Sequence, residues 1–259
     1  MKKKMYLSVV IPCYNEKKNL DRGVLDEVEN YLKKQEYTSE VIVSDDGSTD
    51  GSLEFVKKFV RGHPRFKQLL NQHGGKPLAV WAGVKKARGE IVLFSDMDQS
   101  TPLGQVAKLL PYFEKNYEVV IGSRGQSRKG FSVLRQSGAI VFRLIRQLLL
   151  VKKIIDTQCG FKAFKTKVAM NLFSRLTIFE ELKKAKGWTV GAFDVELLFI
   201  AQKMGYQIAE VPVKWQDEDQ SVTKGDPGKK YLKESKEMFL EIFRVKLNDL
   251  KGRYRSVNG

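Results

Sequence analysis

The sequence is poor in cysteine, with only Cys13 and Cys159 among 259 residues. Two cysteines are too few for a disulfide framework, so we expect a reducing, cytoplasmic environment. Long apolar runs are missing as well: no stretch approaches the roughly 20 apolar residues that a membrane-spanning helix needs. The apolar stretch behind the first lysines is one strand long and breaks at Pro12, which is not the pattern of a secretory signal. With 42% apolar residues, the chain can still bury a full core.

Acidic residues are also scarce, with 30 Asp and Glu against 46 Lys and Arg and a formal net charge of +16. Such an excess indicates an anionic partner: nucleic acid, lipid headgroups or a phosphorylated substrate. The segment from Val119 to Ile155 contains no acidic residue at all. Its cationic residues are Arg124, Arg128, Lys129, Arg135, Arg143, Arg146, Lys152 and Lys153.

Apolar patterning predicts alternating strands and helices. The expected strands are residues 6–12, 40–44, 66–71, 90–95 and 117–123. The expected helices are residues 18–34, a helix with Leu53, Val56 and Val60 that Asp50 caps, residues 76–89, and a helix opened by Thr101-Pro102. This alternation predicts an α/β domain with a mainly parallel central sheet flanked by helices. We expect this domain to span residues 1–223, followed by a basic amphipathic helical tail over residues 224–259.

Polar clusters follow three of the expected strands: Tyr14-Asn15-Glu16, Asp45-Asp46, and Asp96 with Asp98. Ligands of open parallel sheets collect at the carboxyl ends of the strands, so we expect these clusters to lie close together. Two carboxylates spaced i and i+2 can converge on one hard cation, Mg²⁺ or Mn²⁺, that also takes phosphate oxygens. Alternatively, Asp98 begins a turn and Asp96 is a solvated strand end, which is the commoner case for an isolated Asp-x-Asp.

Several blocks of sequence, taken in order, resemble the family 2 glycosyltransferases, which have the nucleotide-sugar-binding fold called GT-A. These blocks are "SVVIPCYNE", "VIVSDDGSTDGS", "GGKPLAVWAGVKKARGEIVLFSDMDQSTP" and "VVIGSR". Two more, "DTQCGFKAF" and "FDVELLFIAQKMGYQIAEVPVKW", are similar to a narrower group, the dolichyl-phosphate β-glucosyltransferases, whose close relatives are the polyprenol-phosphate mannose synthases. The resemblance covers roughly residues 5 to 223.

The resemblance implies a role for individual residues on the donor side. In the family, the first block lines the nucleotide pocket, the next acids meet the base and the ribose, and a Gly-Lys contacts the nucleotide. The matching residues are Pro12, Tyr14 and Glu16, then Asp45 and Asp46, and then Lys76. Asp96 and Asp98 match the metal-binding pair. The alternatives are that Tyr14 only packs in the core and that Asp45 caps a turn.

On the acceptor side, the resemblance places Arg124, Arg135 and Ser137 where lipid-phosphate enzymes hold the acceptor phosphate. Two arginines suit this role because a guanidinium can grip phosphate with two parallel hydrogen bonds. Arg135 could instead be only a solvated charge. A phosphate monoester is already an anionic nucleophile, so positioning and charge screening become the main catalytic tasks.

A sugar hydroxyl, in contrast, needs a general base. We expect His63 and His73 to be surface residues, and Cys159 to be buried rather than nucleophilic. Asp194 or Glu196 would be the base, or would position the donor sugar. As structure alone, Asp194 is a good N-cap for a helix that has Leu197, Leu198 and Ala201 on its inner face and ends at Gly205.

Two basic amphipathic segments could contact a membrane. The stretch "GAIVFRLIRQLLLVKKII" either lies in a membrane interface or faces the core while its arginines reach solvent. The tail carries apolar residues at helical intervals and could dock on the catalytic domain, lie on the membrane or pair with another copy; they are Leu232, Phe239, Ile242, Phe243 and Leu250. The anchor and membrane helices of some relatives are missing from this sequence, so we expect peripheral attachment.

The sequence therefore predicts an inverting, metal-dependent glycosyltransferase. It would move glucose from UDP-glucose to a polyprenyl phosphate at the cytoplasmic face of a membrane. Mannosyl transfer from GDP-mannose is the alternative within the class. A nucleic-acid-binding module is the alternative outside it, although the sequence shows no zinc-finger spacing, RNA-recognition aromatic block or basic zipper.

Overall fold

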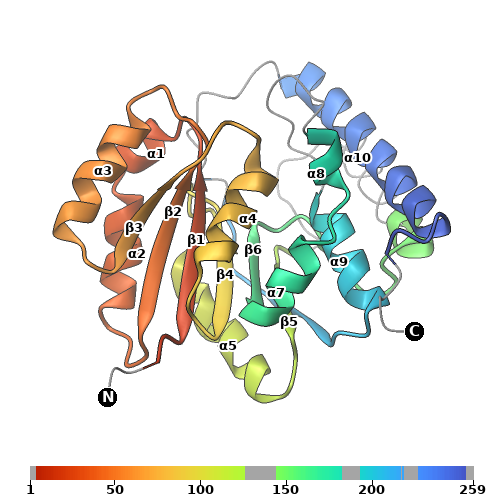
Figure 1. Cartoon of the computed structure of the whole chain (residues 1–259), viewed down its shortest axis with the longest axis horizontal. Helices are drawn as coiled ribbons and strands as arrows, with labels where there is room; N and C mark the ends of the chain where they lie inside the picture. Colours follow the sequence, from red (N-terminus) through yellow and green to blue (C-terminus); the bar gives the residue numbers. More distant parts are fainter. Residues whose placement is uncertain (1–3, 126–143, 183–192, 217, 219–226, 255–259) are drawn as a thin grey trace.

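A seven-stranded sheet organises the molecule, with strand order β3-β2-β1-β4-β6-β5-β7 (Figure 1). The computed structural model describes residues 4–125, 144–182, 193–216, 218 and 227–254. The strands are β1 (Leu7–Cys13), β2 (Ser39–Asp45), β3 (Phe66–Leu70), β4 (Ile91–Ser95), β5 (Val119–Ser123), β6 (Phe161–Lys165) and β7 (Ile208–Pro212). Pairing is parallel throughout except at β6, which runs antiparallel to both β4 and β5. The predicted α/β class and mainly parallel sheet are confirmed.

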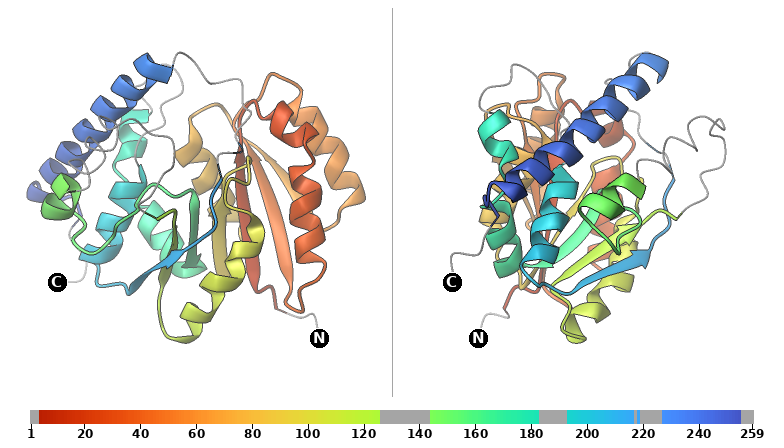
Figure 2. Two further views of the ribbon diagram at one scale, coloured as in Figure 1. Left: turned by 180° about the vertical axis from the view of Figure 1, so that it is seen from behind. Right: turned by 90° about the vertical axis from the view of Figure 1, so that its right-hand side faces the viewer.

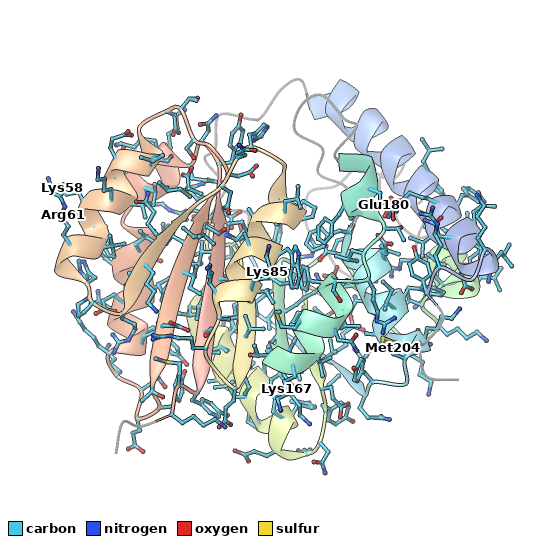
Figure 3. The ribbon with its side chains drawn as sticks, in the orientation of Figure 1. Lys58, Arg61, Lys85, Lys167, Glu180 and Met204 are labelled. Carbon is cyan, nitrogen blue, oxygen red and sulfur yellow. The ribbon has the colours of Figure 1, made fainter. Side chains whose placement is uncertain are left out.

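Helices cover both faces of this sheet. They are α1 (Lys17–Asp21), α2 (Val24–Leu32), α3 (Ser52–Gly62), α4 (Lys76–Lys86), the 3₁₀-helix η1 (Leu103–Gln105), α5 (Val106–Glu114), α7 (Thr166–Phe173), α8 (Ile178–Leu182), α9 (Phe193–Lys203) and α10 (Pro227–Leu250). Alternate strand residues point to opposite faces, so neighbouring residues of β1 enter different cores. Val10 belongs to the core cluster that also contains residues of α4, α7, α9 and α10, whereas Val9 belongs to the one that contains residues of α2, α3 and α5. On α3, Lys58 and Arg61 point away from the sheet (Figure 3).

Several predicted element boundaries differ in the structure: α4 ends at Lys86 and not at Gly89, and three further differences have a clear local cause. Gly23, with φ +88°, divides the expected long helix into α1 and α2. The N-cap of α3 is Gly51, not Asp50; the Asp50 carboxylate instead accepts the backbone N–H groups of Ser52 and Lys17. Strand β1 continues one residue past Pro12, because its ladder with β2 extends to Cys13.

The acid-free segment is described only from residue 144 onward, so its first part lies outside the described residues. Residues 144–149 are helical, and Ile145 and Leu149 pack against the core. Arg146 is buried, and its guanidinium donates to Thr157 Oγ1 and to the backbone carbonyls of Ile154 and Ile155. The expectation that the arginines of this segment reach headgroups or solvent is therefore wrong for Arg146, because its guanidinium donates hydrogen bonds to the turn that follows the helix.

The tail docks on the catalytic domain through one face of α10. Ile242 and Val245 are fully buried in the same core cluster as α9, and Phe239 packs against that cluster. Leu232 and the expected boundary near residue 223 lie outside the part of the chain whose side chains are described. Among the described residues, no helix combines the length and the apolar character that crossing a membrane requires.

A buried acid ties the strands together at the sheet edge opposite the polar clusters. Glu40 accepts hydrogen bonds from the Ser8 hydroxyl (2.8 Å), the Lys67 ammonium (2.8 Å), and the backbone and side chain of Arg88 (2.8 and 2.9 Å). Burial alone would raise the pKa of Glu40, but the donors Lys67, Arg88 and Ser8 outweigh it and lower the pKa to about 2. The acid is therefore charged at all ordinary pH values.

Replacing this acid should weaken the fold in a pH-dependent way. We expect Glu40→Gln to lower the free energy of unfolding by about 2 kcal/mol at neutral pH, since several donors lose a charged acceptor. Because the folded pKa lies below the ordinary 4.5, this contribution is present above pH 4.5 and fades as the pH falls toward about 2. Urea unfolding of both proteins across this range measures it. Glu90→Gln, which removes the exposed ion pair with Lys4, is the control and should cost at most about 1 kcal/mol. Equal losses in the two variants would contradict the assignment.

Candidate active site

The loops after β1 and β2 are joined by hydrogen bonds at the carboxyl edge of the sheet. The β1–β2 register pairs Cys13 with Asp45, so the residues that follow both strands emerge side by side. Backbone N–H groups of one loop bind side chains of the other: Asn15 to Ser48 Oγ (3.0 Å) and Glu16 to Ser52 Oγ (2.9 Å). The first two polar clusters therefore form one surface, as their strand-end positions predict.

Asp46 connects this surface to the N-terminus of α4. Its side chain is buried, and its two oxygens accept the backbone N–H groups of Gly74 (3.0 Å) and Gly75 (2.8 Å). His73 lies 3.0 Å from the same carboxylate and stacks on the Tyr14 ring, with 4.4 Å between ring centroids. Burial raises the pKa of Asp46, although the two amides and His73 act in the opposite direction. His73 is exposed, as the sequence predicts, but it lies beside Asp46 and Tyr14 at the same edge of the sheet.

Asp45 is fully buried, and only one of its two carboxylate oxygens accepts hydrogen bonds from the described residues. Its Oδ1 accepts the backbone N–H groups of Gly47 and Ser48, both at 2.9 Å. Its Oδ2 is buried with no hydrogen-bond partner among the described residues. A buried carboxylate oxygen without a donor is costly, and native proteins keep few such atoms. Asp45 therefore caps its own turn with one oxygen, while the other has no donor among the described residues.

The two aspartates after β4 have different partners. Asp96 Oδ1 lies 2.5 Å from the Lys76 ammonium at the start of α4. Asp98 accepts the backbone N–H (2.9 Å) and the hydroxyl (2.8 Å) of Ser100. Burial would lower the pKa of Lys76, but the carboxylates of Asp96, Asp194 and Asp98 raise it to about 12, so Lys76 is charged at neutral pH. Asp96 and Lys76 are thereby held at the same edge as Asp45 and Asp46.

Whether this pair suits a divalent cation depends on the other ligands. Two carboxylates supply the oxygen donors that Mg²⁺ and Mn²⁺ prefer. No group of three or more His, Cys, Asp or Glu that could hold a metal occurs among the described residues. Mg²⁺ sites often use one or two carboxylates with waters and substrate phosphates. The donor set therefore fits a cation that arrives with a phosphorylated ligand.

Gly160 makes room for the first of these carboxylates. A Cβ atom added at Gly160 would lie 1.9 Å from Asp96 Oδ2. Gly160 immediately precedes β6, which runs antiparallel to β4 and therefore begins where β4 ends. The absence of a side chain at this position lets the Asp96 carboxylate lie against the backbone.

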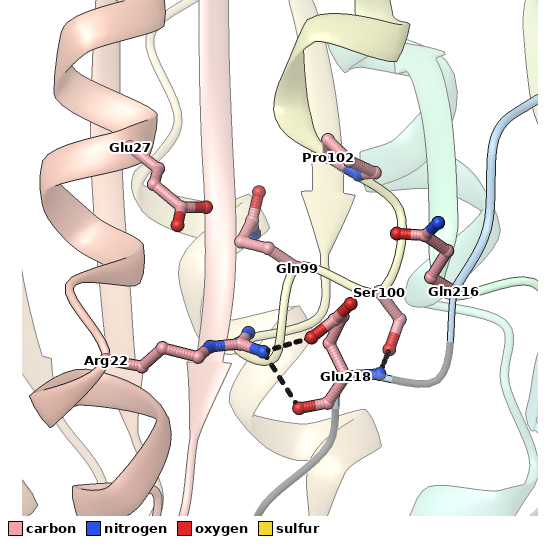
Figure 4. Close-up of a pocket in the computed structure, with 7 residues that line it drawn as sticks. All are labelled: Arg22, Glu27, Gln99, Ser100, Pro102, Gln216 and Glu218. Carbon is pink, nitrogen blue, oxygen red and sulfur yellow. Dashed lines mark hydrogen bonds and ion pairs between the residues drawn. The ribbon is translucent and has the colours of Figure 1, made fainter.

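Hydrogen bonds and an ion pair hold the segment after β7 against the loop that carries Asp98. Arg22 forms an ion pair with Glu218 (2.9 Å) and donates to the backbone carbonyl of Asp98, and the Gln216 N–H donates to the Ser100 carbonyl (2.9 Å). A pocket of about 260 Å³ opens beside these contacts (Figure 4); it is lined by Arg22, Glu27, Gln99, Ser100, Pro102, Gln216 and Glu218. The Asp98 loop is thus held from two distant parts of the chain.

Arg124 is held in a fixed position by Asp156. Its Nε and Nη2 donate to the two carboxylate oxygens (2.7 and 2.8 Å), and its guanidinium lies 5.7 Å from the Trp215 ring centroid. Burial would raise the pKa of Asp156, but Arg124 outweighs it and holds that pKa well below its ordinary value. Arg135 and Ser137, the other residues expected to hold an acceptor phosphate, lie outside the described residues.

Asp194 is paired with a lysine that the sequence reasoning did not single out. Helix α9 begins at Phe193, so Asp194 lies in its first turn and is not the expected N-cap. Its carboxylate accepts a hydrogen bond from Lys162 Nζ at 2.7 Å, and Lys162 also donates to the Cys159 carbonyl. Lys162 is fully buried on β6, with its ammonium 5.3 Å from the Phe94 ring centroid. The sequence signal for this pair is a lysine between the apolar residues Phe161 and Ala163 of the strand.

Glu196 is a structural residue. It is fully buried and accepts hydrogen bonds from Thr177 Oγ1 (2.6 Å), Tyr254 (2.7 Å) and Arg244 (2.7 Å). These partners come from the loop before α8, the end of the chain and α10. Glu196 therefore holds the tail against α9, which leaves Asp194 as the acid of this helix that faces the site.

Comparisons with known proteins agree with this geometry. Residues 8–173 match the family described as glycosyl transferase family 2. The chain therefore belongs to the family 2 glycosyltransferases, as the order of its sequence blocks predicts.

Within that family, its relatives include dolichyl-phosphate β-glucosyltransferases from distant eukaryotes. The chain is 36% identical over 233 residues to one from Trichomonas vaginalis, which covers 85% of this chain and 68% of that protein. It is 38% identical over 227 residues to the mouse protein, covering 81% of this chain and 67% of that protein. Identity to the Dictyostelium discoideum protein is 34% over 267 residues, covering 96% of this chain and 76% of that protein.

Solved structures confirm the GT-A fold. Glucosyl-3-phosphoglycerate synthase from Mycobacterium tuberculosis, crystallised with Mn²⁺, UDP and glucosyl-3-phosphoglycerate, superposes with a TM-score of 0.63 at 18% identity, covering 93% of this chain and 80% of that one. Mannosyl-3-phosphoglycerate synthase from Rubrobacter xylanophilus gives a TM-score of 0.58 at 17% identity, covering 98% of this chain and 77% of that one. At these identities the likeness defines the fold alone.

The Lys162–Asp194 pair should be detectable as an energetic coupling. We expect Lys162→Met to destabilise the protein by about 3 kcal/mol or more, because it leaves a largely buried carboxylate without its cation. Adding Asp194→Asn should recover part of this loss, with a coupling of about 1–3 kcal/mol in a double-mutant cycle measured by urea unfolding. Lys165→Met on the same strand is the control, since Lys165 is partly exposed and its ion pair with Glu118 is long, at 3.6 Å. Additive losses would show that the two side chains do not depend on each other.

Proposed function

We propose that this protein is an inverting transferase that moves glucose from UDP-glucose to a polyprenyl phosphate, and that it requires Mg²⁺ or Mn²⁺. One observation carries the proposal: Asp45, Asp46, Lys76, Asp96 and Asp98 gather at one edge of a GT-A sheet. The names of the relatives, dolichyl-phosphate β-glucosyltransferases, support the sugar and the lipid acceptor.

The donor nucleotide would bind over β1, β2 and the start of α4. Asp45 Oδ2, buried and lacking a partner among the described residues, is an acceptor suited to an N–H group of the base. Asp46 would face the ribose, and the residues from the end of β1 would line the pocket; they are Pro12, Tyr14 and Glu16. Tyr14 already stacks on His73, so a preformed aromatic wall is present.

Asp96 and Asp98 would hold the divalent cation. When bound, the cation neutralises negative charge that develops on the departing diphosphate. Lys76 lies against Asp96 and is charged at neutral pH, so it supplies a second positive charge beside the same leaving group. The arrangement supports a role for Asp96, Asp98 and Lys76 on the diphosphate side of the bond that would break.

The acceptor phosphate would bind beside Arg124, with Arg135 and Ser137 as further proposed contacts. A guanidinium carries five N–H donors, more than the two side-chain donors that Asp156 engages in Arg124. The ion pair fixes the orientation of Arg124, and a fixed donor costs less to align with phosphate than a mobile one. Because phosphate is anionic before it attacks, the reaction needs no group to remove a proton.

Asp194 would then position the donor sugar and not act as a base. Lys162 keeps the carboxylate in place next to the Cys159 carbonyl and the β6 backbone. Asp194 also contributes to the charge around Lys76, so it lies near the proposed cation and diphosphate. We place the reaction at the cytoplasmic face of a membrane, to which the enzyme binds peripherally.

An assay of the purified protein tests the proposal directly. The protein is given UDP-glucose, UDP-galactose or GDP-mannose with a short polyprenyl phosphate, with and without Mn²⁺. We expect transfer from UDP-glucose only in the presence of the metal, and calorimetry should show preferential binding of UDP over GDP. A preference for GDP-mannose would show that the assignment of UDP-glucose as the donor is wrong. Transfer that proceeds equally well after chelation would show that the reaction does not require a metal.

The metal assignment predicts the effect of one substitution. Asp98→Asn should lower metal-dependent transfer by about 100-fold or more, because the cation is worth several kcal/mol of charge stabilisation. The fold should persist, since an amide oxygen can still accept the Ser100 N–H. Thermal unfolding and the rate at saturating UDP-glucose are measured together, with Asp26→Asn on the exposed face of α2 as the control. Full activity in Asp98→Asn would exclude the assigned role.

A further inference from the structure

An apolar stripe runs along the outer face of α10. Leu240, Phe243, Leu247 and Leu250 are 57%, 52%, 55% and 71% exposed. Their 3-4-3 spacing places them on one side of the helix, opposite the buried Ile242 and Val245. Contiguous exposed apolar side chains of this size mark an interaction site more often than an ordinary surface.

A second exposed apolar group lies on the same side of the molecule. Residues 144–149 and α10 both pack on the core cluster that includes α9, and Figures 1 and 2 show both at the edge of the molecule beyond α9. Leu144 and Leu148, one turn apart, are largely exposed. Lys152 and Lys153 follow them and are also exposed. Two separate segments therefore present leucines with lysines beside them.

The charges around the stripe indicate what covers it. Lys246 and Lys251 flank it. Glu241 pairs with Arg244, and Asp249 is shared by Lys203 and, at 3.7 Å, by Lys246, so the charged side chains described around the stripe keep a positive excess. The rim of the stripe is therefore cationic. Such a surface is complementary to a layer that is apolar inside and anionic outside.

A second copy of the chain fits this surface less well. If Leu240 and Leu247 occupy the a positions of a coiled coil, Lys246 is at g and Lys251 at the following e, so a parallel partner would bring lysines together. Toward the N-terminus, the same spacing of four and three residues reaches Lys236 and Lys233, so the apolar repeat begins only at Leu240. A stable coiled coil needs about three to four heptads of apolar residues, which this helix does not have.

We propose that the stripe on α10, together with Leu144 and Leu148, is the surface that docks on an anionic lipid bilayer. The leucines and Phe243 enter the boundary between headgroups and acyl chains, and the lysines contact the headgroups. This inference rests on the proposed function in one respect: a polyprenyl-phosphate acceptor is embedded in a membrane, so the enzyme that uses it must work at a membrane surface. It assigns the attachment to named residues of the tail and of the segment after β5.

Vesicle binding tests the docking surface. The full chain and the variant Leu247→Asn/Leu250→Asn are sedimented with vesicles of phosphatidylcholine alone or with added phosphatidylglycerol. We expect the wild-type chain to bind the anionic vesicles and to lose binding at high salt, and the variant to bind at least about tenfold more weakly. Leu70→Asn is the matched control, because Leu70 is 59% exposed on β3, far from α10 in Figure 1, and should bind like the wild type.

The other outcomes separate this inference from the proposed function. Unchanged vesicle binding in the variant, or no binding by the wild type at low salt, overturns the docking surface. A wild-type dimer that the variant converts to monomer, measured by light scattering, assigns the stripe to a second copy instead. Transfer to a short, soluble polyprenyl phosphate should be equal in wild type and variant. If that transfer fails in both while vesicle binding behaves as expected, the proposed reaction is wrong and the docking surface stands.

Discussion

The site depends on holding several carboxylates at one sheet edge despite their mutual repulsion. The acids there have separate partners: Asp96 has Lys76, Asp194 has Lys162, Asp46 has the amides of Gly74 and Gly75, and Asp98 has the N–H and hydroxyl of Ser100. Lys76 and the two glycines lie at and just before the start of α4, and Lys162 lies on β6, so elements far apart in the sequence meet at the same edge. The exception is Asp45 Oδ2, and a buried acceptor left over in such an arrangement is the feature expected of a binding site.

Much of the fold could be predicted from the sequence because its signals are local. Runs such as "SVVIP" and "EIVLFS" are apolar on both faces of a strand, and the polar residues that follow them mark the carboxyl edge. The proximity of the clusters after β1, β2 and β4 follows from parallel pairing alone. The break at Gly23 and the αL cap at Gly51 were missed, because a glycine in a polar stretch does not reveal whether its φ is positive.

The partners of the site residues could not be predicted, because they are contacts across long sequence separations. Nothing near Arg124 indicates that Asp156 fixes its guanidinium, and nothing near Glu196 indicates that Arg244 and Tyr254 converge on it. Lys162 is buried because its side chain lies between Phe94 and α9 on one face of the sheet, a position that the sequence of β6 does not specify. The sequence thus identifies the chemical groups, while tertiary contacts decide which are held rigid and which are offered to a ligand.

The single reversed strand has a consequence for how this architecture can change. Strands β1 to β4 form one continuous stretch of chain that carries the acids proposed for the nucleotide, whereas β6 and the residues around it come from the second half of the chain. Because β6 begins at the edge where β4 ends, the later half reaches the first at a short seam around Gly160. Exchange of the later half between relatives would therefore leave the acids proposed for the nucleotide unchanged, provided that the seam keeps its glycine.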